Sequence, residues 1–279
     1  MSGLTYWPQP ASAARPARPV RVAASAAAAP RKALYLDGRE QAIDLRLAGP
    51  ALSITRAARR TEVPLARVAR VVVCGRVHWD SAALAACLQH GLPVIFLDGR
   101  ARPLGAAAPL ADHGSSLDEL LACWVERRRW REGWDNWLRA QRYRVLRHWV
   151  RERAQRGLPV AAGEWKEAVR SFVYVPEAEF TGPNPGGCYA LVVSLLLRAG
   201  VRLQYRAADG GALPLAAELA RLVDRRGALG LGSLAPAVAV GDAALTRAAE
   251  TNSPDLEQYA IELLARLRRN LADRIEPCP

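Results

Sequence analysis

One short segment gathers residues that could perform chemistry. Residues 163–172 read GEWKEAVRSF and place two carboxylates, Glu164 and Glu167, beside an indole and two basic side chains. The pattern predicts the opening of a helix. Carboxylate oxygens are the ligands that Mg²⁺ and Mn²⁺ prefer. The segment is therefore either a metal-binding motif or what is left of one.

The other potential metal ligands are scattered along the chain. Its four histidines are His78, His90, His113 and His148, so none follows residue 148. The five cysteines form no Cys-x-x-Cys pair, which argues against structural zinc or a disulfide framework and favours a reducing cytoplasm. The chain contains neither a P-loop nor a Gly-x-Ser-x-Gly motif, so these two enzyme classes are not indicated.

The charge points to a polyanionic partner. The net charge is +12 over 279 residues, and arginine supplies most of it. Arginine binds phosphate oxygens in a forked geometry, so a chain this basic suggests nucleic acid, although a high-GC genome would also enrich arginine. The candidates for DNA phosphate binding are Arg139, Arg142, Arg147, Arg151 and Arg170. The alternative is a solvated helix face whose arginines cover tryptophans.

The N-terminal part of the chain predicts a β-rich domain. Residues 1–30 contain Ala, Pro and Arg without a carboxylate and predict a disordered basic leader. Residues 31–105 predict this domain, and within it the alternating apolar segments of residues 33–68, broken by Asp-Gly and Ala-Gly-Pro, predict hairpins of a small antiparallel sheet. Within that domain, VARVVVCG predicts a strand buried on both faces. A helix is expected next, with Ser81 as its N-cap and Gly91 just past its end.

The remainder predicts an all-α domain, which makes the fold class α+β. Residues 106–116 are rich in small residues and predict a linker, and residues 117–279 predict helices. Leu138, Val145 and Trp149 have the spacing of one apolar helix face, and the segment 186–200 predicts a central buried helix. No apolar run is long enough to span a membrane.

One stretch of the N-terminal domain resembles a known family. VPLARVARVVVCGRVHWDSAALAACLQHGLPVIFLDGRARPLG is similar to the β-domain of the CRISPR-associated Cas-one family, the integrase-nuclease of spacer acquisition. The Val-Pro-Leu, the Gly-Arg-Val turn, the helix start and the Arg-Pro-Leu-Gly follow in the same order. The helical part resembles the family more weakly. The resemblance implies a homodimer formed through the β-domain, a small Cas-two partner and double-stranded DNA.

The resemblance also implies a divalent metal held by a Glu, a His and one or two further carboxylates. The family motif E-G-x-A-A-R-x-Y aligns with residues 165–172, so its Glu falls on Trp165 and its Gly on Lys166. The expected histidine, near residues 203–212, is missing. The acidic pair falls on Pro214 and Ala217. The resemblance thus leaves no confident catalytic residue, no metal site and no cofactor.

Three interpretations remain open. The first is a non-catalytic DNA-binding protein of the adaptation type, acting alone or beside an active paralogue. The second is an active divergent nuclease or integrase in which Glu164, Glu218 and Asp224 hold Mg²⁺ or Mn²⁺. The third is a protein-interaction module whose basic surface is incidental. The sequence leaves open whether the protein is an enzyme.

Overall fold

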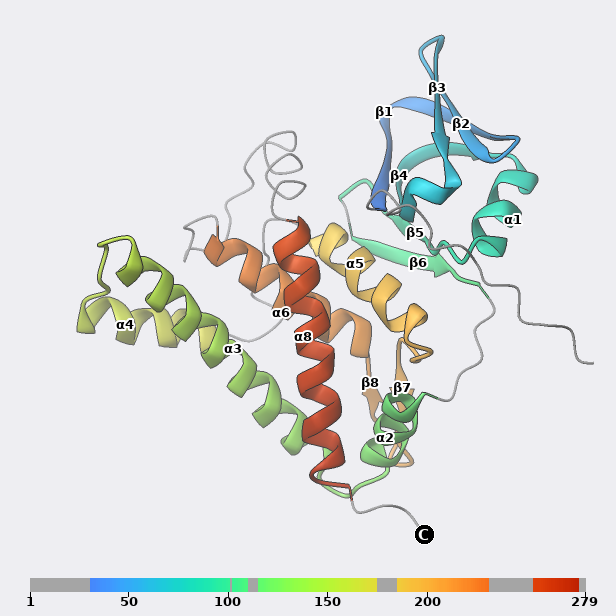
Figure 1. The fold of residues 1–279 in the computed structure, drawn as a ribbon. Coiled ribbons are helices and arrows are strands. Elements are labelled where there is room, and N and C mark those ends of the chain that lie inside the picture. Colours follow the sequence, from blue (N-terminus) through green and yellow to red (C-terminus); the bar gives the residue numbers. More distant parts are fainter. Residues whose placement is uncertain (1–30, 101, 110–114, 175–184, 231–252, 276–279) are drawn as a thin grey trace, which may run out of the picture. The chain divides into compact units, whose positions relative to one another are not determined.

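The computed structural model describes residues 31–100, 102–109, 115–174, 185–230 and 253–275. The predicted leader and part of the predicted linker lie outside these ranges. A six-stranded sheet precedes a group of helices (Figure 1), which confirms the α+β class. Residues 31–279 form one compact unit. The predicted domain boundaries stay predictions.

The sheet has the strand order β3-β2-β1-β4-β5-β6. The strands β1–β2–β3 and the pair β5–β6 are antiparallel, as the predicted hairpins require, but β4 runs parallel to both β1 and β5. The predicted antiparallel pairing is found for β1, β2 and β3, whereas β4, for which no direction was predicted, forms parallel pairs at the centre of the sheet. Between β1 and β4 the chain returns through β2, β3 and a 3-10 turn (Leu65–Arg67), and between β4 and β5 it returns through a helix (Ser81–Gln89), which makes the two parallel pairs possible. The strands are β1 (Lys32–Ala48), β2 (Ala51–Arg56), β3 (Arg59–Pro64), β4 (Val68–Trp79), β5 (Val94–Leu97) and β6 (Pro103–Ala107).

A β-bulge replaces the turn that Asp37-Gly38 suggests. β1 runs on as one strand, and its pairing with β4 shifts register between Gly38 and Ile43. Gly38 lies opposite Gly75, whose φ is +79°. A Cβ on Gly38 would lie 2.3 Å from the carbonyl oxygen of Arg76. Both glycines are therefore required by the close approach of two backbones.

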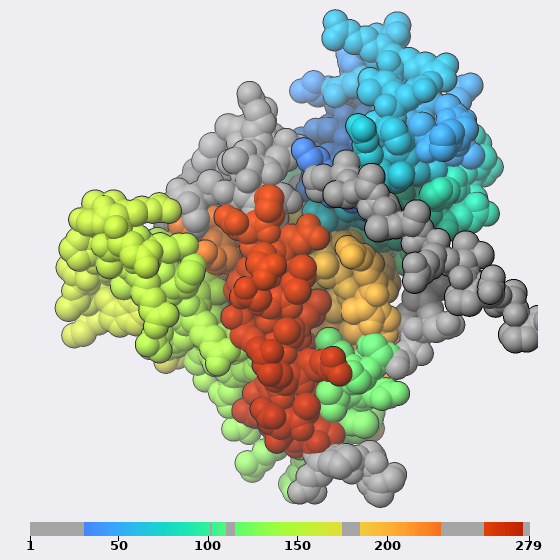
Figure 2. All heavy atoms as spheres, in the orientation of Figure 1, coloured from blue at the N-terminus to red at the C-terminus, as the bar shows by residue number. Residues whose placement is uncertain are grey.

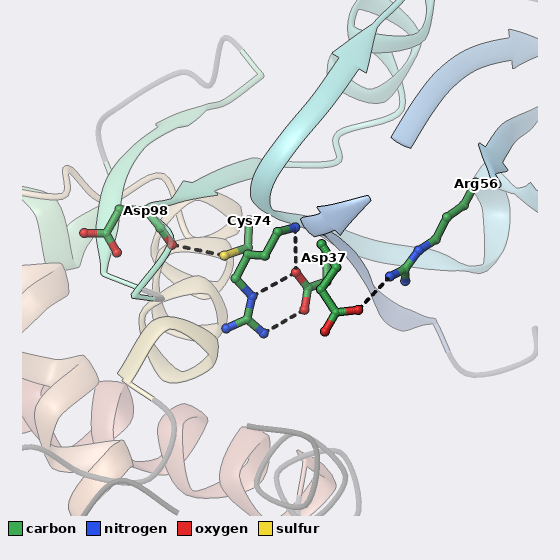
Figure 3. A network of polar contacts seen from close by, with 6 residues as sticks. Asp37, Arg56, Cys74 and Asp98 are labelled. Atoms are coloured by element: carbon green, nitrogen blue, oxygen red, sulfur yellow. Dashed lines mark hydrogen bonds and ion pairs between the residues drawn. The ribbon is translucent and has the colours of Figure 1, made fainter. Parts of the chain in front are cut away.

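Polar contacts fix the two strands where this bulge begins (Figure 3). The Asp37 carboxylate accepts hydrogen bonds from the backbone N–H of Arg39 at 3.1 Å and from its guanidinium at 2.7 and 2.9 Å. The side-chain bond to Arg39 lowers the pKa of Asp37. On β4, the Cys74 thiol donates to the carbonyl oxygen of Asp98 at 3.0 Å, which ties β4 to the end of β5.

The helix α1 (Ser81–Gln89) begins one residue earlier than predicted. Asp80 is the N-cap and accepts from the backbone N–H of Ala82, whereas Ser81 is the first helical residue. An aspartate carboxylate satisfies the free N–H groups of a first turn at least as well as a serine hydroxyl does. Gly91 follows the helix with φ +71°, as predicted for a residue just past a helix end.

The first half of β4, Val68–Val73, is largely buried on both faces, as predicted, whereas the residues from Gly75 onward are half-buried or exposed. Val71 and Val73 pack in a cluster with α1, whereas Val72 belongs to the cluster formed by the helices. Ile95 of β5 joins Val72 in that second cluster. The core of the helical region therefore continues onto one face of the sheet.

The helical region differs from the all-α prediction by one small hairpin, β7 (Tyr205–Arg206) with β8 (Ala212–Leu213). α5 is buried along most of its length, and Leu138, Val145 and Trp149 are at most 5% exposed, so both core predictions are confirmed. In the described ranges, no helix has the length and apolarity needed to cross a membrane. The helices are α2 (Ser116–Val125), α3 (Trp130–Gln155), α4 (Ala162–Ala168), α5 (Pro185–Arg198), α6 (Leu215–Gly230) and α8 (Ser253–Ala272); α4 continues into a π-helical turn (Val169–Val173).

Candidate functional site

The GEWKEAVRSF segment forms α4 and its π-helical continuation. Trp165 is half-buried there and packs edge-on against Tyr143 of α3, with ring centroids 6.3 Å apart and planes at 61°. The indole is part of an apolar cluster that includes Trp149, Phe172 and Leu229. The position that the resemblance assigns to a metal-binding glutamate is therefore a packing position between helices.

The neighbouring carboxylate is already engaged. Glu164 forms an ion pair with Arg153 of α3. The guanidinium of Arg153 also lies over the ring of Trp149, 5.0 Å from its centroid. Glu167 is exposed, and its nearest cation is Arg170 at 3.8 Å. The two glutamates of the segment thus face basic side chains.

The positions assigned to the acidic pair lie where α6 begins. Pro214 immediately precedes the helix and Ala217 is half-buried in its first turn. Glu218, the next residue, is also half-buried, and burial raises its pKa against the opposing charge of arginines, of which Arg221 is the strongest. A carboxylate with a raised pKa is easier to protonate, which weakens it as a ligand for a cation.

Asp224 lies deeper in the fold. It is 3% exposed, and the thiol of Cys188 on α5 donates to its Oδ1 at 3.9 Å. Burial raises the pKa of Cys188 well above its usual range, and the Asp224 charge adds to this effect. A thiol held neutral is a hydrogen-bond donor and not a metal ligand.

Two arginines hold the π-helical turn that follows Trp165. Arg142 of α3 donates to the carbonyl oxygen of Val173 at 3.1 Å, and Arg225 of α6 donates to that of Phe172 at 2.6 Å. Arg225 is fully buried, and burial lowers its pKa to about 9, with the charge of Arg142 acting in the same direction. Two cationic groups therefore act on the backbone next to the candidate metal position.

Sequence reasoning missed Arg225, although a signal was present. Arg225 lies three residues after Leu222 and four before Leu229, so it falls on the apolar stripe of α6. A charged residue on such a stripe is either paired or hydrogen-bonded inside the core. Its bond to the Phe172 carbonyl could not be predicted, because the π-helical turn was not.

The segment expected to carry the family's histidine is occupied by the β7–β8 hairpin. Tyr205 donates its hydroxyl to Oδ1 of Asp118 on α2 at 2.5 Å, and the same oxygen accepts from the backbone N–H and the Nε of Arg202 at 2.9 and 3.1 Å. Burial alone would raise the pKa of Asp118, but these donors outweigh burial and lower it. The network anchors the hairpin to α2.

The three fallback carboxylates have separate partners: Glu164 with Arg153, Glu218 near Arg221 and Asp224 with Cys188. Across the described ranges, no group of three or more His, Cys, Asp or Glu side chains is arranged to hold a metal ion.

The predicted DNA-binding arginines do not share one surface. Arg139 and Arg170 are exposed, and Arg139 donates to Asn136 at 3.0 Å. Arg142 is half-buried and bound to the π-helical turn, whereas Arg147 and Arg151 line a groove between α3, α6 and α8. Successive helix residues are rotated by about 100°, so Arg142 and Arg151 lie on opposite sides of α3.

The chain is similar to known proteins in sequence and in fold. Residues 34–121 match the family model described as CRISPR associated protein Cas1. A CAS1 protein from Thermotoga maritima matches with a TM-score of 0.61 at 14% identity, over 86% of this chain and 96% of that one. The protein is Cas1-like. The predicted resemblance is thus confirmed, by sequence in the N-terminal region and by fold over most of the chain.

Two further solved structures agree with the Cas1 fold. TtCas1 matches with a TM-score of 0.53 at 16% identity, over 84% of this chain and 98% of that one. A casposase bound to its integration product matches with a TM-score of 0.52 at 13% identity, over 72% of each chain. Identities this low establish the fold alone. The comparison with curated proteins found no match.

Proposed function

We propose that this Cas1-like protein is a CRISPR-adaptation subunit that binds double-stranded DNA and lacks the metal-dependent catalytic site. The observation that carries the proposal is Trp165, an indole packed against Tyr143 where the Cas1 motif has its glutamate. An indole offers a hard cation no oxygen ligand, and Lys166 beside it would repel one.

The surrounding residues do not fit a divalent cation. Pro214 and Ala217 provide no side-chain donor, and Glu218 lies among arginines that compete for its charge. Arg142 and Arg225 bring two positive charges to the same region through the π-helical turn. A bound cation would therefore meet basic groups where it needs carboxylates. No reaction step is assigned to a metal.

DNA binding follows from the exposed guanidiniums of α3. Arg139, Arg147 and Arg151 are exposed, and Arg170 follows on the π-helical turn. Guanidiniums bind phosphate oxygens without reading sequence, and each phosphate contact releases counterions. This chemistry needs no metal.

The assembly that we propose follows the family. It consists of a homodimer formed through the β-domain, together with a small Cas2-like protein or a catalytically active paralogue. One solved structure of the same fold is a casposase bound to an integration product. Within this proposal, the present chain supplies phosphate contacts while a second protein supplies catalysis.

Fluorescence anisotropy with a labelled blunt duplex tests the proposal. We expect binding that is equal in Mg²⁺ and in EDTA and that weakens steeply as potassium chloride increases. Replacing Arg147 or Arg151 by Gln should each lower the salt slope by about 1. Arg100→Gln, an exposed site on the β5–β6 hairpin, is the matched control and should leave the slope unchanged. Binding that requires Mg²⁺ would contradict the proposal.

An active divergent site is the second candidate. Glu218 favours it, because a half-buried carboxylate with a raised pKa is a frequent property of catalytic residues. It predicts Mg²⁺- or Mn²⁺-dependent nicking that is lost in Glu164→Ala and in Glu218→Gln. Nicking that survives both substitutions would exclude this candidate.

A further inference from the structure

A polar groove lies between α3, α6 and α8. It encloses about 520 Å³, which is in the range of small-ligand pockets. In Figure 1, α3 and α8 lie close together at their lower ends and diverge upward, and Figure 2 shows the same two helices as neighbouring columns of atoms. The residues that line the groove come from the C-terminal half of α3 and the N-terminal part of α8, with Arg226 of α6.

Three arginines present one basic face to this groove. Arg144, Arg147 and Arg151 follow one another at i, i+3 and i+7, so they share a side of α3. All three are exposed, and within the described ranges none has a hydrogen bond or an ion pair. Arg139 is rotated by about 140° from Arg144 and lies outside the groove. Three guanidiniums without an internal partner therefore face the groove together.

The acidic residues of the groove are partly neutralised by internal partners. Glu152 accepts from Arg226 at 3.1 and 3.2 Å and lies 3.0 Å from the Nε2 of His148. Glu262 accepts from the Gln258 amide at 3.1 Å and lies 3.9 Å from Arg266. With five arginines against Glu152, Asp255 and Glu262, the lining keeps a charge of +2 when His148 is neutral. That charge favours an anionic ligand.

An aromatic ring and unsatisfied donors complete the groove. Tyr259 lines it, and the guanidinium of Arg266 lies over the Tyr259 ring, 5.4 Å from the centroid. The Tyr259 hydroxyl and the Nε of Arg266 are buried, and neither has a hydrogen-bond partner in the described part of the chain. Buried donors without a partner are uncommon in folded proteins, and a bound ligand is one explanation for them.

We propose that this groove is a binding site for a single phosphate-bearing nucleotide, either free or at the end of a DNA strand. Arg144, Arg147 and Arg151 bind the phosphate, the Tyr259–Arg266 pair lies against the base, and the Gln258 amide is placed to meet a base edge. This site differs from a surface that contacts the phosphate backbone of a duplex, because it is a groove that accommodates one nucleotide and contains an aromatic ring. It requires no catalysis.

Calorimetry with the full-length protein tests the proposal, using ATP, inorganic phosphate and a 5′-phosphorylated hairpin oligonucleotide as separate probes. We expect ATP or the phosphorylated hairpin to bind more tightly than inorganic phosphate. The probe that binds tighter identifies the free or the strand-end nucleotide as the source. Arg151→Gln should weaken nucleotide binding roughly tenfold or more, because it removes a charge-assisted contact. Arg100→Gln, which makes the same charge change on the β5–β6 hairpin outside the groove, should leave nucleotide binding within about twofold, as expected for a site away from the contact.

Tyr259→Phe provides a second variant that keeps the ring and removes only the buried hydroxyl. We expect it to lower nucleotide affinity while leaving the affinity for a closed dumbbell duplex, which has no strand ends, unchanged. Failure of every nucleotide probe while the dumbbell duplex still binds would overturn this inference and leave the proposed function intact. Equal binding of inorganic phosphate and nucleotide, or an equal loss in Arg100→Gln and Arg151→Gln, would also overturn it.

Discussion

The sheet and the helical region resemble the Cas1 family in different ways. In the sheet the likeness extends to sequence, and its glycines and buried strands are positions that backbone geometry requires, such as Gly38 opposite Gly75. In the helices the likeness is one of fold, and the positions assigned to ligands are filled by Trp165, Pro214 and Ala217. Under the proposed function, the fold has outlasted the metal chemistry, because a metal ligand contributes to a reaction more than to packing.

We expect the largest loss of stability at Gly75, where the backbone conformation and the space available favour glycine alone. Gly75 has φ +79°, and a Cβ there would lie 2.6 Å from backbone atoms of Gly38 and Arg39. We expect Gly75→Ala to lower the free energy of unfolding by about 3 kcal/mol or more, through strain and overpacking. Urea unfolding measures the loss. Gly99→Ala is the control, because nothing lies within 4 Å of a Cβ there. Similar losses of stability in both variants would mean that the close backbone approach at the β1–β4 bulge does not require glycine at position 75.

The next largest loss of stability is expected at the β7–β8 hairpin, which occupies the segment where the family was expected to have its histidine. Asp118→Ala removes the acceptor for Tyr205 and Arg202 and should cost about 2–3 kcal/mol at neutral pH. The pKa of Asp118 is lowered in the folded state, so its contribution is present above the unfolded pKa of about 4 and is lost as pH falls through the lowered folded pKa.

Chemical unfolding of both proteins across the acid range tests this dependence. The stability difference between the wild type and Asp118→Ala should shrink below about pH 4. Asp273→Asn, at an exposed position after α8, should show no such change. A difference that stays constant down to the lowest pH would mean that the Asp118 network does not anchor the hairpin.

Two substitutions at Trp165 distinguish a packing position from a metal-ligand position, and both should change stability less than the variants above. Trp165→Phe keeps an aromatic ring beside Tyr143 and should cost under about 1.5 kcal/mol. Trp165→Glu places a carboxylate in the apolar cluster and should cost about 2 kcal/mol. Thermal unfolding with and without Mn²⁺ measures both. Stabilisation of Trp165→Glu by Mn²⁺ would show that the remaining ligands persist and would weaken the contrast between the two regions.

Local patterns in the sequence predict the parts of this fold that depend on neighbouring residues. The apolar run of β4, the buried helix α5 and the core positions Leu138 and Trp149 follow from periodicity and are found as predicted. The parallel pairing of β4 and the continuity of β1 depend on strands far apart in the chain, so local patterns could not reveal them. The cap was assigned to Ser81 instead of Asp80 for a different reason, because both residue types are strong helix caps and the two are adjacent in the sequence.

The sequence predicted which residues occupy the candidate site but not the contacts that surround them. Trp165, Pro214 and Ala217 could be assigned from the motif alone. The role of Arg225 depends on the π-helical turn, and the split of the α3 arginines depends on how α8 packs. The spacing of the arginines along α3 does not reveal which of them a neighbouring element will bury. Arg142 was taken for a free cation, and the structure binds it to the Val173 carbonyl.

Strand transfer tests the central claim most directly. A labelled duplex is incubated with supercoiled plasmid and the full-length protein, alone and with a small Cas2-like partner, in Mg²⁺ or Mn²⁺. Our account predicts duplex binding with a steep salt dependence and no covalent transfer of label to the plasmid. Metal-dependent transfer that disappears in Glu164→Ala would contradict it, because Glu164 would then be a ligand and not the ion-pair partner of Arg153.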